Sequence, residues 1–268
     1  CAVQALTCAN GGRPNPPHPG TRIVTHRTEE PTTAMHPFTI PPGIAARVAA
    51  RCGTPHPFSR LDPARTALVV IDMQNGFMRA DVAHALCPMA EHVVPAINRL
   101  AAALRGAGGA VVWIQNTFDA SCETEWSVMQ AMATPEANAR RAASMSEGTV
   151  GHQLWPGLDI RPADQVVRKK RYSAFIQGSS ELPAILRARD IDTVLITGTV
   201  TNVCCESSAR DAMMLNFRTV MVSDGCAAVT DEEHAASLIA FHLQFGDVLT
   251  VDECIAGFAP AVQKAAAE

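Results

Sequence analysis

A thiol, a carboxylate and an ammonium group occur in this chain at positions where they could act together on one substrate. They are Cys204, Asp72 and Lys169, and each lies at the end of, or just after, a short apolar run typical of a buried strand. A cysteine attacks a carbonyl carbon as its thiolate, a carboxylate can take the thiol proton, and an ammonium group can hold negative charge. The combination therefore indicates covalent catalysis by a cysteine.

Taken one at a time, each of these residues also has a structural explanation. Cysteine is among the most buried residue types and packs as a small hydrophobe. Asp72 could cap the turn that follows its strand. Lys169 lies in the charged run RKKR, residues 168–171, which could be a solvated face. Their joint presence at the ends of separate apolar runs is what favours catalysis.

Cys204 is predicted to lie in the first turn of a helix, because Thr201 and Asn202 are both favoured N-cap residues. In that position the free backbone N–H groups and the positive end of the helix dipole would lower the pKa of the thiol below its usual value of ~8.5. We therefore expect a catalytic cysteine here to be alkylated well below about pH 8, and a buried structural cysteine to resist alkylation.

The elements that must position these residues begin at Thr66, where short apolar runs start to alternate with longer segments of helical periodicity. This alternation is typical of βαβ units and predicts an α/β fold with a mostly parallel sheet. Since ligands gather at the carboxyl ends of parallel strands, such a sheet brings the three candidates to one edge. The predicted strands are residues 67–72, 110–115, 165–169, 193–199, 219–224 and 247–251, and the predicted helices are residues 89–109 and the segments that follow residues 181, 203 and 231.

Three segments resemble, in this order, the signature motifs of the isochorismatase-like cysteine hydrolases. They are ALVVIDMQNGF (67–77), KKRYSAF (169–175) and TGTVTNVCCESSARDA (197–212), and the resemblance covers about residues 64–255. It implies a single domain with a doubly wound sheet and helices on both faces. It also implies a catalytic triad of Asp72, Lys169 and Cys204.

The same resemblance implies further details of the site. The lysine of the family precedes the serine of the SAF segment by four residues, which selects Lys169 and leaves Lys170 as the alternative. Cys205 corresponds to a packing position. The bond between Thr199 and Val200 is expected to be a cis peptide bond, and the backbone N–H groups of Val200 and Cys204 are expected to form the oxyanion hole.

Nicotinamidase-like relatives bind a metal through an Asp-x-His motif after the second strand. Residues 115–130 contain Asp119 but no histidine, so we predict no metal and no other cofactor. Five histidines occur singly on predicted helices or loops and are expected to be surface residues or satisfied core residues: His84, His92, His152, His234 and His242.

The segments WIQNTFD (113–119) and TNVCCES (201–207) resemble the ureidoacrylate and N-carbamoyl amidohydrolase branch of the family. In that branch Asn116 would contact the substrate, although it could equally cap the following turn. Gln74 and Asn75 could hydrogen-bond either substrate or backbone. Tyr172 and Phe175 could line the pocket or belong to the core.

The function implied by the resemblance is a hydrolase acting on the C–N bond of a small amide, ureido or N-carbamoyl substrate. The triad would form a thioester and release ammonia or an amine. Two alternatives remain: hydrolysis of the vinyl ether of an isochorismate-like substrate, and a non-catalytic binding or assembly protein that keeps the fold.

Composition restricts the partners. The net charge of −4 and the scattered basic residues argue against a nucleic-acid partner. No apolar run reaches the ~20 residues that cross a bilayer and no signal-peptide pattern is present, so we expect a cytoplasmic protein with no membrane partner and reduced thiols. Because family members are commonly oligomers, we expect a homo-oligomer, a dimer or a tetramer.

The predicted domain, residues 61–258, is flanked by two segments of different character. Residues 1–60 are rich in proline and show no sustained period, which predicts an irregular or disordered N-terminal arm. Residues 259–268 form a C-terminal tail. Residues 119–160 are predicted to be a lid or specificity insert, and the apolar faces of helices 89–107 and 232–245 are predicted to pack between subunits.

Overall fold

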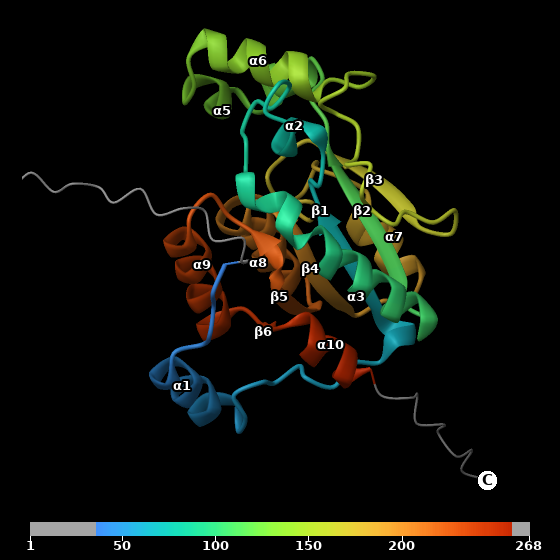
Figure 1. Ribbon diagram of the computed structural model, residues 1–268, viewed down its shortest axis with the longest axis vertical. Helices are drawn as coiled ribbons and strands as arrows, with labels where there is room; N and C mark the ends of the chain where they lie inside the picture. The colour runs from blue at the N-terminus through green and yellow to red at the C-terminus, as the bar shows by residue number, and fades with distance from the viewer. Residues whose placement is uncertain (1–35, 259–268) are drawn as a thin grey trace, which may run out of the picture. The chain divides into compact units, whose positions relative to one another are not determined.

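The computed structural model describes residues 36–258 (Figure 1). Most of the predicted arm, residues 1–60, and the predicted tail, residues 259–268, therefore lie outside the described residues. The division of the chain into an arm, a domain from residue 61 and a tail stays a prediction.

Six parallel strands form one sheet in the order β3-β2-β1-β4-β5-β6. This order reverses direction between β1 and β4, the switch point at which doubly wound sheets open a crevice for ligands. All six predicted strands are present, although β5 is longer than predicted and β6 is shorter. The strands are β1 (Thr66–Ile71), β2 (Ala110–Asn116), β3 (Gln165–Lys169), β4 (Thr193–Thr199), β5 (Arg218–Ala227) and β6 (Asp247–Leu249).

Helices cover both faces of this sheet, as the resemblance implies. Side chains alternate along each strand, so Leu68 and Val70 of β1 pack on one face while Val69 and Ile71 pack on the other. The first face is covered by the 3₁₀ helix η2 (Pro88–Val93), α3 (Val94–Gly106) and α10 (Val251–Gly257). The second is covered by α7 (Leu182–Ala188), α8 (Glu206–Met214) and α9 (Asp231–Gln244).

The apolar faces of α3 and α9 lie against the sheet and not at a surface. Leu100 and Leu104 of α3 and Leu238 and Phe241 of α9 are all fully buried. The prediction that these two faces pack between subunits is therefore wrong, because the core of this chain already covers them. The exposed large apolar side chains among the helices on the second face are instead Met213 and Met214 of α8.

One helix lies within the segment predicted to be irregular. Residues Pro42–Cys52 form α1, which contacts α9. Pro42 stands in the first turn, where a missing backbone N–H costs nothing, and Gly53 ends the helix in the left-handed conformation at φ 79°. The prediction of irregular backbone is wrong for these residues, since the alanine-rich run between the two terminating residues favours a helix.

The remaining helices gather beyond the carboxyl ends of β1 and β2. Figure 1 shows α2, α5 and α6 together at the top of the view. Their bounds, with that of the 3₁₀ helix η1 before β1, are η1 (Pro63–Arg65), α2 (Asn75–Met78), α4 (Ser121–Glu125), α5 (Ser127–Ala131) and α6 (Pro135–Met145). Among all the helices of residues 36–258, none is both long and apolar enough to cross a membrane.

Close contact between β1 and β4 depends on Gly198. It pairs with Ile71 and has φ 109°, and a Cβ atom there would lie 2.0 Å from the carbonyl oxygen of Ile71. Only glycine tolerates both the positive φ and this approach.

We expect Gly198→Ala to lower the free energy of unfolding by about 3 kcal/mol, because backbone strain and steric overlap add. Gly108→Ala is the matched control, since Gly108 also has a positive φ of 90° but open space around it. The control should cost about 1 kcal/mol. Urea unfolding of both variants measures the difference, and equal losses would contradict the assigned close contact.

Candidate active site

Asp72 and Lys169 form a fully buried ion pair at the carboxyl edge of the sheet. Asp72 directly follows β1 with φ 53°, and its backbone N–H donates to the carbonyl oxygen of Ile114 in β2. Lys169 ends β3, on the other side of β2. Its Nζ lies 2.7 Å from Oδ2 of Asp72, and both side chains are 0% exposed. The sheet order thus brings together two of the predicted site residues that are distant in sequence.

The alternative lysine lies outside this pair. Nζ of Lys170 contacts Oδ2 of Asp119 at 2.6 Å, and the Lys170 side chain is 37% exposed. Successive residues of a strand point to opposite faces, so only one of the two lysines can reach Asp72. Lys169 also donates to the carbonyl oxygen of Arg171 at 2.9 Å, which fixes the direction of its ammonium group.

Cys204 lies where β4 leads into α8. The Thr199–Val200 peptide bond is cis, as expected, and Thr201–Cys205 then form one π-helical turn before α8 begins at Glu206. The predicted α-helix therefore starts later than its favoured capping residues suggest. Cys204 is 3% exposed, and its thiol lies close enough to Asp72 and Lys169 for both side chains to shift its pKa.

Cys205 has the packing role that the sequence predicts. It is 0% exposed and belongs to the core on the second face of the sheet, with its Sγ 3.8 Å from the carbonyl oxygen of Thr197. Its backbone N–H donates to the carbonyl oxygen of Val200. Of the two adjacent cysteines, Cys204 is the one whose pKa both Asp72 and Lys169 shift.

Helix α9 supports the turn that carries Cys204. The hydroxyl group of Thr201 lies 3.0 Å from Nδ1 of His234. The hydroxyl group of Ser237 donates to Oε2 of Glu206 at 2.7 Å. These contacts hold both ends of the π-helical turn against α9, so the position of the thiol depends on a helix that contains none of the predicted site residues.

Burial dominates the electrostatics of the three groups. It raises the pKa of the Cys204 thiol to about 12, with Lys169 opposing the rise and Asp72 adding to it. It also raises the pKa of Asp72, against the attraction of Lys169. Burial acts to lower the pKa of Lys169, but the negative charges of Asp72 and Cys204 outweigh it and the pKa is raised. The expectation of a lowered thiol pKa is therefore wrong, because burial and the charge of Asp72 together outweigh the opposing charge of Lys169.

The three amide side chains predicted to bind substrate lie close to the carboxyl edge. Gln74 donates to the carbonyl oxygens of Asn116 and His152 and accepts from the backbone N–H of Asn116. Both N–H donors of its side chain are thus used. This favours the alternative in which Gln74 hydrogen-bonds to the backbone and not to a substrate. Asn75 and Asn116 each keep a buried Oδ1 without a hydrogen-bond partner among the described residues. These two oxygens are available to a bound molecule.

The two aromatic residues predicted to line a pocket or belong to the core have different surroundings. Phe175 is 2% exposed and its ring packs edge-on against Phe217. It is therefore a core residue, which is one of the two roles that the sequence left open. Tyr172 is 39% exposed and packs edge-on against Trp126. Both Tyr172 and Trp126 line an open cavity of about 520 Å³ on the outer side of α8.

Arg141 of α6 is a residue that the sequence did not single out. Its side chain is buried, its guanidinium lies over the rings of Phe118 and Trp126, and it has no carboxylate partner within residues 36–258. Burial lowers its pKa, while the negative charges of groups that include Cys204 and Asp72 act to raise it. No motif marks this arginine; only its position in the predicted specificity insert, residues 119–160, hints at it.

Comparison with known proteins is consistent with this geometry. The isochorismatase domain family matches residues 66–253. The ureidoacrylate amidohydrolase RutB of Variovorax paradoxus is 35% identical over 224 residues, which are 77% of this chain and 86% of that protein. The ureidoacrylate amidohydrolase RutB of Pseudomonas savastanoi pv. phaseolicola is 33% identical over 240 residues, 84% of this chain and 95% of that protein.

Two solved structures share the fold. A cysteine hydrolase from Pseudomonas syringae pv. phaseolicola superposes with a TM-score of 0.66 at 27% identity, covering 74% of this chain and 93% of that one. The N-carbamoylsarcosine amidase from Thermoplasma acidophilum superposes with a TM-score of 0.57, also at 27% identity, covering 70% and 97%.

The raised pKa of Cys204 predicts slow alkylation at neutral pH. The rate of iodoacetamide labelling at Cys204 should rise about tenfold for each pH unit between pH 8 and 10, because the thiolate fraction rises in that proportion. At pH 8 it should stay well below the rate at the exposed Cys52. Mass spectrometry of the two labelled peptides measures both rates. A rate at Cys204 that is already constant below pH 8 would contradict the prediction.

Proposed function

This chain belongs to the isochorismatase family, and from that premise we propose that it is a cysteine-dependent amidohydrolase. Its substrate is a small amide, ureido or N-carbamoyl compound, and the bond cleaved is a C–N bond. One observation carries the proposal: the thiol of Cys204 lies against a buried ion pair of Asp72 and Lys169. A thiol packed only for its volume needs neither a base nor a cation beside it.

The first step is the transfer of the thiol proton to Asp72. A carboxylate whose pKa is raised by burial is a stronger base than an exposed one, which suits it to this role. The transfer leaves the net charge of the buried site unchanged, because a thiolate replaces the carboxylate as the partner of Lys169. The proton therefore moves without a new charge being created in a water-free environment.

The thiolate then attacks the carbonyl carbon of the substrate. Lys169 and the backbone N–H groups of Val200 and Cys204 hold the negative charge that develops on the oxygen. As the C–N bond breaks, Asp72 returns its proton to the departing nitrogen, and ammonia or an amine leaves a thioester on Cys204. Water, deprotonated by Asp72, cleaves the thioester and restores the thiol. No step requires a metal or another cofactor.

The buried guanidinium of Arg141 favours a substrate that carries a carboxylate group. A buried guanidinium without a carboxylate partner is costly, and its five N–H donors match a carboxylate group. The relatives are named for ureidoacrylate, which carries such a group. The side-chain oxygens of Asn75 and Asn116, which have no hydrogen-bond partner among the described residues, could accept N–H groups of an amide or ureido nitrogen.

Two other functions remain as alternatives, and the oligomeric state is a separate proposal. Hydrolysis of a vinyl ether would release no ammonia, and a non-catalytic binding or assembly protein would turn over nothing. We retain the homo-oligomer and the cytoplasmic location as proposals, together with a small-molecule partner and no nucleic acid or membrane partner.

Ammonia release from a panel of small amides, ureido acids and nicotinamide tests the proposal. Cys204→Ala should lower the rate at least about 10³-fold, because the covalent route is lost. The matched control is Cys205→Ala, which removes the neighbouring core thiol and should keep the rate within about threefold. Treatment with a chelator should leave both results unchanged. Release that survives Cys204→Ala would refute the assigned nucleophile, and pyruvate release without ammonia would favour ether cleavage.

If Arg141 binds the carboxylate of the substrate, its removal should lower kcat/KM only for substrates that carry a carboxylate. Arg141→Ala should lower kcat/KM for ureido acids about 10- to 100-fold, the value of one charged hydrogen-bonded contact, and should change it less than threefold for neutral amides. Arg140→Ala, at an exposed neighbour on the same helix, is the control and should change neither. Steady-state kinetics on matched acid and amide pairs measures the ratio. Equal losses for both substrate types would assign Arg141 a structural role only.

A further inference from the structure

A second cluster of chemically active side chains lies far from the candidate active site. It consists of His56, which follows α1, His242 of α9 and Asp247, the first residue of β6. Strand β6 is at the opposite edge of the sheet from β3, which carries Lys169, and Asp247 is at the amino end of its strand. The proposed hydrolysis uses none of these residues.

The distances within the cluster match those between ligands of one metal ion. Nδ1 of His56 lies 3.0 Å from Oδ1 of Asp247, and Nδ1 of His242 lies 3.5 Å from the same oxygen. One ligand atom from each residue lies within 4.8 Å of the other two. Zinc bound tetrahedrally with bonds of ~2.0–2.1 Å separates neighbouring ligand atoms by about 3.3 Å, between the two measured distances.

The cluster is built into the fold and is not a chance surface grouping. Asp247 is 0% exposed, and its two oxygens accept backbone N–H groups from Val248 and Phe58, which orient the carboxylate. His242 is also 0% exposed, yet neither of its ring nitrogens has a hydrogen-bond partner among the described residues. A metal ion between Nδ1 of His242 and Oδ1 of Asp247 would satisfy the nitrogen that faces the carboxylate.

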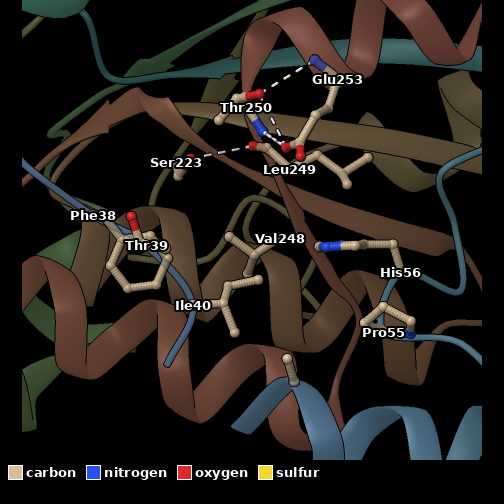
Figure 2. A pocket seen from close by; sticks show the side chains of 11 residues that line it. Phe38, Thr39, Ile40, Pro55, His56, Ser223, Val248, Leu249, Thr250 and Glu253 are labelled. Atoms are coloured by element: carbon tan, nitrogen blue, oxygen red, sulfur yellow. Dashed lines mark hydrogen bonds between the residues drawn. The ribbon is translucent and has the colours of Figure 1, made fainter. Parts of the chain in front are cut away.

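A cavity gives access to the cluster. The side chain of His56 is 29% exposed and lines a cavity of about 410 Å³. Figure 2 shows its imidazole beside Pro55, with Ile40 and Val248 among the other residues that line the cavity. An ion could therefore reach the cluster from solvent, and water could complete its coordination.

We propose that His56, His242 and Asp247 bind a divalent transition-metal ion of the zinc type, with water in the remaining position. Two imidazoles and one carboxylate suit zinc better than calcium or magnesium, which prefer oxygen ligands alone. The ion would join the segment after α1 to the end of α9 and the start of β6, which lie almost 200 residues further along the chain. It takes no part in hydrolysis, so this proposal does not depend on the proposed function.

Zinc titration of the chelator-treated, full-length protein tests the site. The unmodified protein should bind one more equivalent of zinc than His56→Ala, measured by competition with a chromophoric chelator, and the variant should bind at this site at least about 100-fold more weakly. Saturating zinc should raise the Tm of the unmodified protein and not that of the variant. His92→Ala, at an exposed histidine outside the cluster, is the control and should behave like the unmodified protein.

Comparison between variants separates this site from any binding by the other histidines and cysteines of the chain. His242→Gln, which removes a ligand from a different element, should lose the same equivalent as His56→Ala. Equal stoichiometry and an equal Tm shift in the unmodified protein and both cluster variants would overturn the proposal. So would loss of the same equivalent in His92→Ala. Ammonia release should be unaffected by removal of zinc, whatever the outcome of the titration.

Discussion

The buried pair of Asp72 and Lys169 is the interaction on which the candidate site depends. Two charges held 2.7 Å apart with no solvent exposure cost several kcal/mol each to desolvate, so neither is tolerable without the other. The sheet meets this requirement because β1 and β3 flank β2 and all three strands end at the same edge. The position of the pair also sets where the thiol must lie to exchange a proton.

The nucleophile is positioned by elements on the second face of the sheet. The π-helical turn that carries Cys204 is held by Thr201 and Glu206 against α9, while Cys205 fills the core beneath it. Neighbouring residues of such a turn point in different directions, which is why two adjacent cysteines have different surroundings. The protonated thiol in this dry environment fits a mechanism in which Asp72 acts as a base when substrate is present, and not one with a preformed thiolate.

Segments outside the sheet determine what else the fold can bind. Arg141 of α6, in the insert after β2, is a buried cation without a carboxylate partner among the described residues, and the charges of Cys204 and Asp72 act to raise its pKa. At the far edge of the sheet, the segment after α1 brings His56 to Asp247 and His242. In this second place, neither ring nitrogen of the buried His242 has a hydrogen-bond partner among the described residues, which indicates a ligand.

The sequence by itself predicted the six strands and a mostly parallel sheet, because apolar periodicity is a local signal. The resemblance of three short ordered motifs to a known family implied the doubly wound arrangement and selected Asp72, Lys169 and Cys204 as site candidates. The sequence did not determine α1, the late start of α8, the core position of Phe175, the backbone contacts of Gln74 or the isolation of Arg141 and His242. Nor could it give the raised pKa of Cys204, since desolvation depends on how many distant atoms exclude water from the thiol. Only the tertiary structure decided these features, because burial and unsatisfied partners are properties of packing between segments and not of any one segment.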